Sequence, residues 1–248
     1  MRLFQGLFLL VALVGFSLFA ISCGSSNAQY RVVDTMAGLS YNVDIDVNVA
    51  TPSSTTATYS NVGWGNAEPS SGYAKIATGS DPIEVFQAGT TTPVINSTAL
   101  NLSSNQYTVL LLGVGSGVAA PESQLLTDNN NAPTAGNGEF RIVNASPSAP
   151  GGSVDIYLVP PGTNIGSVSP NVSGLTYAQP STYVSLSAGA SGSSTTYLLY
   201  VTPQGNKTPY INGQSYSLSA GQIYTIVLID VSGGGAISGV PILLTDVK

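Results

Sequence analysis

Residues 140–147 of the chain read FRIVNASP, and after a Gly-Gly turn residues 154–158 read VDIYL. An earlier stretch nearly repeats both pieces, with YRVVD at residues 30–34 and VDIDV at residues 43–47. The arginines of the two copies, Arg31 and Arg141, are 110 positions apart, so a whole domain separates them. The sequence therefore predicts a tandem repeat of domains.

Later parts of the two copies also match. Residues 67–70 (AEPS) return as 178–181 (AQPS), 106–111 (QYTVLL) as 223–228 (IYTIVL), and 125–128 (LLTD) as 243–246 (LLTD). Repeats of this length predict two separately cored domains rather than a solenoid of short units. We expect the first domain over residues 29–127, an exposed linker over 128–138, and the second domain over 139–248.

The alternation of side chains predicts β-strands. In residues 43–47 and 154–158 the aliphatic side chains share one face, which leaves Asp44, Asp46 and Asp155 on a solvated face. Only 7% of the residues are charged, and this composition favours strands joined by turns over exposed helices. The predicted fold class is all-β, with two tandem antiparallel β-sandwich domains of the immunoglobulin or transthyretin type.

Further strands are expected at residues 73–78, 83–87, 107–112, 124–127, 182–187, 196–202, 224–229 and 241–245. Two of these, 107–112 and 224–229, are apolar on both faces. Such runs predict central strands that are covered on both sides or that lie against the neighbouring domain.

The pattern FRIVNASP followed by VDIYL resembles the opening of the bacterial domain-of-unknown-function family 4397. The resemblance covers the mature chain as two copies, although DTMA at residues 34–37 replaces NASP in the first copy. It implies a β-sandwich in a secreted or envelope protein. The family has no established activity, so the resemblance supplies no catalytic residues.

The N-terminal segment has the pattern of a lipoprotein signal. Arg2 precedes an apolar run over residues 3–21, and Cys23, the single cysteine of the chain, follows it. We expect a signal peptide over residues 1–22 and a lipidated tether over 23–28, with the acyl chains on Cys23. The alternative is an uncleaved signal anchor, because the run approaches the ~20 residues that span a bilayer. Either way the expected location is the cell envelope, at the outer membrane or periplasmic face if the cell is Gram-negative.

Composition excludes several kinds of chemistry. The chain has no histidine, which removes Ser-His and Cys-His nucleophile pairs and most zinc sites. Asp44 and Asp46 lie about 7 Å apart along one strand face, a separation close to that of glycosidase carboxylates, but a flat sheet lacks the cleft such catalysis needs. We predict no enzyme activity and no cofactor, with a hydrolase using this pair as a distant alternative. A net charge of −6 without a basic patch argues against nucleic acid as a partner.

Two groups of residues could bind a ligand. Asp128 and the three asparagines after it carry oxygen ligands that suit Ca²⁺, but we interpret these residues as a linker and predict no metal site. Trp64, Tyr59 and Tyr73 could form a sugar-stacking platform, although tyrosines also commonly fill the edges of sandwiches.

Each copy places one arginine and one aspartate at matched positions in its first two strands. We predict structural pairs, Arg31 with Asp44 and Arg141 with Asp155, that hold strand register. The function expected from these features is a structural, adhesive or protein-interaction module of the cell envelope, and the alternative is a carbohydrate-binding surface protein. The expected partners are the lipid bilayer through acylated Cys23 and envelope proteins or polysaccharide.

Overall fold

A computed structural model describes residues 27–48, 57–113, 119–149, 152–190 and 192–246. The predicted signal peptide and Cys23 lie outside the described residues. Within the described part, the chain forms strands β1 to β17 and one short 3-10 turn, Ile165–Ser167, and contains no α-helix. In the same part of the chain, no helix is long and apolar enough to cross a membrane.

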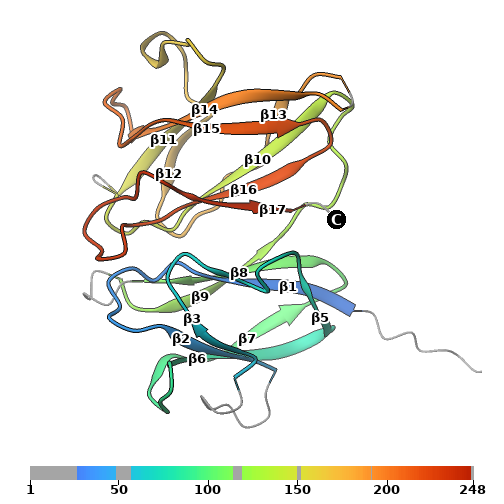
Figure 1. The fold of residues 1–248 in the computed structure, drawn as a ribbon, viewed down its shortest axis with the longest axis vertical. Coiled ribbons are helices and arrows are strands. Elements are labelled where there is room, and N and C mark those ends of the chain that lie inside the picture. The colour runs from blue at the N-terminus through green and yellow to red at the C-terminus, as the bar shows by residue number, and fades with distance from the viewer. Residues whose placement is uncertain (1–26, 49–56, 114–118, 150–151, 191, 247–248) are drawn as a thin grey trace, which may run out of the picture.

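The first half of the chain forms two facing sheets (Figure 1). One sheet consists of β4 (Ala67–Glu68), β1 (Asn27–Asp34), β8 (Gln106–Leu112) and β9 (Glu122–Thr127), and β5 (Ala74–Ala77) also pairs with β1. The other sheet consists of β3 (Tyr59–Val62), β2 (Val43–Val47), β6 (Gly79–Gln87) and β7 (Pro93–Leu102). A buried aliphatic cluster that includes Val32, Ile45 and Val109 fills the space between them.

The second half repeats this arrangement. One sheet consists of β13 (Val184–Ser187), β10 (Asn137–Asn144), β16 (Ile223–Leu228) and β17 (Ile242–Thr245). The other consists of β12 (Val172–Thr176), β11 (Ser153–Val159), β14 (Ser194–Pro203) and β15 (Ile211–Ser219). Their core contains Ile142, Ile156 and Leu199 among others. The predicted all-β sandwich fold is therefore confirmed.

The structure adds one topological feature to the antiparallel prediction. In each sandwich the first strand lies parallel to the second-last strand, β1 beside β8 and β10 beside β16. The strands of the opposite sheet come between these two strands in the sequence. The chain then returns to the first sheet in the same direction as its first strand. The sequence does not predict strands β3, β4, β7, β12 and β15. Strand β4 has only two residues, and polar residues on the others weaken the alternation that identifies a strand, as in the largely exposed middle of β7.

A third buried cluster lies between the two sandwiches, where the sheet of β1, β8 and β9 faces the sheet of β10, β16 and β17 (Figure 1). Along β8, Val109 and Leu111 pack inside the first sandwich, whereas Leu110 and Leu112 pack against the second. The prediction that this strand is covered on both faces is thus confirmed. The third cluster contains matched residues from both copies, such as Val33 with Val143 and Leu126 with Leu244. The interface therefore has the self-complementary form of a two-fold contact, although it lies within one chain.

Candidate functional site

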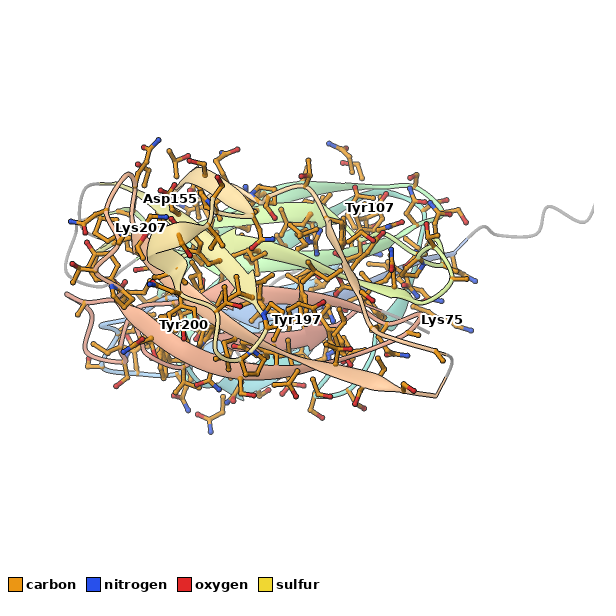
Figure 2. The ribbon with its side chains drawn as sticks, turned by 90° about the horizontal axis from the view of Figure 1, so that it is seen from above. Lys75, Tyr107, Asp155, Tyr197, Tyr200 and Lys207 are labelled. Atoms are coloured by element: carbon orange, nitrogen blue, oxygen red, sulfur yellow. The ribbon has the colours of Figure 1, made fainter. Side chains whose placement is uncertain are left out.

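The charged side chains of this protein lie mainly inside it. All eight aspartates of the sequence are within the described residues and all are buried: Asp34, Asp44, Asp46, Asp81, Asp128, Asp155, Asp230 and Asp246. Arg31 and Arg141 are also buried. Among the described residues, the remaining cations are Lys75 and Lys207, which are exposed and lie toward opposite ends of the molecule in Figure 2. The surface is therefore covered mostly by uncharged polar side chains.

Arg31 connects the first sandwich to the end of the second. Its Nε donates to Thr108 Oγ1 at 2.9 Å, and its Nη1 donates to the backbone carbonyl of Thr245 at 2.8 Å. Its Nη2 forms an ion pair with Asp246, directly after β17. The guanidinium also lies over the ring of Tyr73, 4.8 Å from the ring centre. All three guanidinium nitrogens of this buried cation thus donate a hydrogen bond, to acceptors from both repeats.

Arg141 repeats this arrangement in the opposite direction. Its Nε donates to Thr225 Oγ1 at 3.0 Å, and its Nη1 donates to the carbonyl of Thr127 at 3.0 Å. Its Nη2 pairs with Asp128 at 2.5 Å, and the ring of Tyr183 lies 5.1 Å from the guanidinium carbon. Each repeat therefore supplies the carboxylate that neutralises the arginine of the other.

The two carboxylates also accept hydroxyl hydrogen bonds. Tyr73 and Thr108 donate to Asp128 Oδ2 at 2.8 and 2.7 Å. Thr225 and Tyr183 donate to Asp246 Oδ2 at 2.5 and 3.2 Å. We call these four ionic residues, Arg31, Asp128, Arg141 and Asp246, the ionic cluster. Its formal charges sum to zero, which is the condition under which burial of ions is tolerated.

Burial and neighbouring charges shift the pKa of two members of the ionic cluster, Arg141 and Asp246. Burial alone would lower the pKa of Arg141, but the carboxylate of Asp128, with Tyr183 and Asp246, raises this pKa overall, so the guanidinium stays charged. Burial, with the neighbouring Asp128, raises the pKa of Asp246 against the opposing effect of the two arginines.

The predicted pairs of Arg31 with Asp44 and Arg141 with Asp155 are wrong. Strands β1 and β2 belong to opposite sheets, and Arg31 projects on the same side of β1 as Val33, toward the other repeat. The sequence did carry a signal for the true partners, because both Asp128 and Asp246 end an identical LLTD stretch.

Asp44 and Asp155 have a different role, which both repeats share. Asp44 accepts backbone hydrogen bonds from Asn61 at 2.7 Å and Gly89 at 2.8 Å, while Asp155 accepts them from Gly174 and Gly205, both at 2.9 Å. All four donor residues have positive φ, between 57° and 74°. Each carboxylate therefore ties an irregular neighbouring strand to a turn. The expected solvated face is wrong, since Asp44 is 3% and Asp46 1% exposed.

The three aromatic residues of the predicted platform lie in separate environments. Tyr59 packs edge to face on Tyr30, with the ring centres 6.4 Å apart, beside the core of the first sandwich. Trp64 packs against the cluster between the sandwiches, and Tyr73 covers Arg31 in the ionic cluster. These rings do not form one stacking surface, because each ring packs in a different part of the protein.

Asp128, the candidate calcium ligand, has other partners in the structure. Its oxygens accept hydrogen bonds from Arg141, Tyr73 and Thr108, so cationic and hydroxyl donors occupy the positions that a metal ion would take. Nowhere in the described residues do three or more carboxylate or cysteine side chains gather as a metal site would require.

A groove lies beside the interface, between the sheet edges β4 and β17. Two adjoining cavities of about 360 and 480 Å³ share Ala67, Ser70, Leu243 and Leu244 as walls. Leu243 is 45% exposed there, unlike most aliphatic side chains of the protein. The combined size falls in the range of ligand-binding clefts.

The groove exists because the two repeats differ locally. The backbone N–H of Gly65 donates to the carbonyl of Asp34, and that of Ala178 donates in the same way to the carbonyl of Asn144. In the structure, Gly65 therefore corresponds to Ala178, 113 positions later, whereas the sequence match pairs residues 111 positions apart. The next matched residues, Tyr73 and Tyr183, are only 110 positions apart. The first repeat therefore has three more residues than the second between this turn and its tyrosine. At the corresponding edge of the second repeat, Gln124 donates to the carbonyl of Ala178 at 2.6 Å and closes the gap.

The family model described as "Domain of unknown function (DUF4397)" matches residues 28–157, which is more than half of the chain. The chain belongs to this family. The DUF4397 match includes the first sandwich, both arginines of the ionic cluster and Asp128, and it ends within β11.

Comparison with solved structures returns distant likenesses. A structure described as "Alpha-glucan binding by a streptococcal virulence factor" has 9% sequence identity and a TM-score of 0.27, with 86% of this chain and 96% of that chain covered. A second, of streptococcal family 41 carbohydrate-binding modules, has 10% identity and a TM-score of 0.27, with 86% and 97% covered. A candidate cell adhesion protein of Bacteroides fragilis has 11% identity and a TM-score of 0.17, with 88% and 96% covered. No curated protein matches the sequence.

Proposed function

We propose that this DUF4397 protein is a non-catalytic module of the bacterial cell envelope, anchored by lipid on Cys23, that serves a structural, adhesive or protein-interaction role. The observation that carries the proposal is the burial of most of its charged side chains. Every aspartate is buried, and so are Arg31 and Arg141, the arginines at matched positions of the two repeats. The residues of the ionic cluster and the two strand-tying aspartates are engaged in holding the fold. An enzyme needs acid, base or nucleophilic groups that reach a substrate.

The same proposal treats the two sandwiches as tandem copies of the DUF4397 domain, over residues 29–127 and 139–248, joined by residues 128–138. The repeated topology and the reciprocal ion pairs support this division. The linker begins at Asp128, which is buried in the ionic cluster, so the connection is fixed at its start rather than free. Two linked sandwiches with a shared interior form one rigid spacer suited to presenting a surface away from a membrane.

Contacts with a partner would depend on hydrogen bonds and apolar area rather than on charge. The exposed surface offers few ionic groups. The groove between β4 and β17 combines Leu243 with mostly uncharged residues, and its charged lining residues are Glu68 and the buried Arg31. Long-range electrostatic attraction therefore contributes little to association. We expect binding of a partner to depend only slightly on salt concentration.

Lipid attachment at Cys23 is the feature of the proposal that can be tested most simply. We expect mass spectrometry of the mature protein to show an N-terminal cysteine carrying a diacylglyceryl group and an amide-linked acyl chain, because several acyl chains give stable anchoring where one does not. Cys23→Ala should leave the membrane fraction or keep its uncleaved signal. Cross-linking in intact envelopes, followed by recovery of the protein, should then give partners from the wild type that the variant loses. An unmodified mature N-terminus would refute the anchoring.

A further inference from the structure

Another cavity, separate from the groove, lies at the end of the first sandwich where β1 and β8 begin. It has a volume of about 170 Å³, and Tyr107, labelled in Figure 2, marks this end of β8. Its walls are Asn27, Gln29, Ser104, Asn105, Gln106 and Asn130. We call it the amide pocket, because five of these six side chains are amides and the sixth is a hydroxyl.

Gln106 is the unusual residue of the amide pocket. It is only 5% exposed, and its Nε2 donates to Gln29 Oε1 at 2.7 Å. Its own Oε1 is buried and accepts no hydrogen bond from any described residue. An unpartnered buried carbonyl costs about 1–3 kcal/mol, so this arrangement weakens the fold unless something else pairs with the side chain.

The second repeat shows that the fold does not need a glutamine at this position. Gln29 lies opposite Gln106 in the parallel register of β1 and β8, and Glu139 lies opposite Ile223 in the same register of β10 and β16. Ile223 is buried without an unpaired polar atom. At this position the first repeat therefore has a polar side chain where the second repeat has an aliphatic one.

The chemistry of the walls indicates the ligand. Amide side chains both donate and accept hydrogen bonds, as sugar hydroxyls do, so the two sets complement each other. No charged side chain lines the pocket, which disfavours phosphate, carboxylate or ammonium groups. The volume restricts the occupant to about one monosaccharide unit. We propose that the amide pocket binds a neutral sugar residue.

The sugar could belong to a polysaccharide or to the headgroup of a glycolipid. Asn27, in the pocket wall, is four residues from Cys23, so a fully extended tether spans at most about 14 Å. If Cys23 is lipidated as proposed above, the amide pocket lies close to the membrane, within reach of a glycolipid headgroup. The sugar-binding proposal itself does not require the anchor, so the two can fail separately.

The experiment measures sugar binding by isothermal titration calorimetry. The full-length protein and its Cys23→Ala form are titrated, in a polyoxyethylene detergent that carries no sugar, with soluble dextran and mannan and with galactosyl diacylglycerol dissolved in the same detergent. Alginate serves as the acidic polysaccharide. We expect binding to at least one neutral probe and none to alginate. A response to the glycolipid only identifies a headgroup, and a response to soluble polysaccharide identifies the other source.

Variants assign the binding to the pocket. Gln106→Ile, which introduces the residue of the second repeat, should lower the affinity at least tenfold while thermal stability stays the same or rises. Asn105→Ala should also weaken binding, and Gln222→Ala, at the corresponding place in the second repeat, should not. The proposal is overturned if no neutral probe binds, or if Gln106→Ile and Asn105→Ala bind as tightly as the wild type.

Discussion

Asp128→Ala should be among the most destabilising single substitutions in this protein, lowering the free energy of unfolding by about 3–5 kcal/mol. The reason is that Arg141 would remain buried after losing its 2.5 Å partner, with the next carboxylate, Asp246, 3.8 Å away. The hydroxyls of Tyr73 and Thr108 would also lose their acceptor. Urea unfolding followed by circular dichroism measures this loss, with the exposed Glu122→Ala as the matched control.

Removing both charges should cost less than removing one. In Arg141→Met with Asp128→Leu, no ion remains unpaired by the substitution, so we expect the double variant to be more stable than Asp128→Ala. A loss for Asp128→Ala within about 1 kcal/mol of that for Glu122→Ala, the size of an exposed ion pair, would show that the ionic cluster is not a source of stability.

Asp34→Asn should stabilise the protein at neutral and alkaline pH. Burial raises the pKa of Asp34 to about 7, although a hydrogen bond from the backbone of Met36 opposes the shift. The second repeat has a neutral side chain here, since Asn144 accepts from the backbone of Ser146 in the same way. Each pKa unit corresponds to about 1.4 kcal/mol, so ionised Asp34 destabilises the fold by at most about 4 kcal/mol.

The sign of the pH dependence follows from the raised pKa. Below about pH 4 the carboxyl is protonated in both the folded and unfolded states, and Asp34→Asn should change stability little. Between pH 4 and 7 the unfolded chain releases its proton first, so the wild type loses stability as pH rises, and the gain from Asn reaches its full size above pH 7. Unfolding free energies of wild type and variant from pH 4 to 9 measure the difference. A gain that is equal at pH 4 and pH 8 would contradict the assignment to Asp34.

The sequence was sufficient to predict the all-β fold and most of its strands, because these depend on local pattern. Residues 43–47 and 106–111 carry their alternation or their two-sided apolar character in the letters themselves. The partners of Arg31 and Arg141 could not be found in this way, because alternation tells which residues share a face but not which sheet that face meets. The matched arginines were recognised as structural, but the aspartates nearest in sequence were assigned to them.

The burial of Asp44 and Asp155 was missed for a related reason. A polar residue opposite an aliphatic one on a strand normally faces water. Here, backbone amides of Asn61 and Gly89 cover Asp44, and those segments are not recognisable as partners from the sequence. The groove and the amide pocket were also not predicted from the sequence, because both arise where the two repeats differ. The groove arises from three additional residues in the first repeat, and the amide pocket contains Gln106 where the second repeat has Ile223.

We infer that the ionic cluster and the apolar interface make the two sandwiches one cooperative body. Differential scanning calorimetry of the full chain tests this claim most directly, by comparing the calorimetric enthalpy with the van't Hoff enthalpy. We predict a single transition with the two enthalpies equal. Two separate transitions, or a calorimetric enthalpy about twice the van't Hoff value, would show that the sandwiches unfold independently and that the reciprocal ion pairs do not couple them.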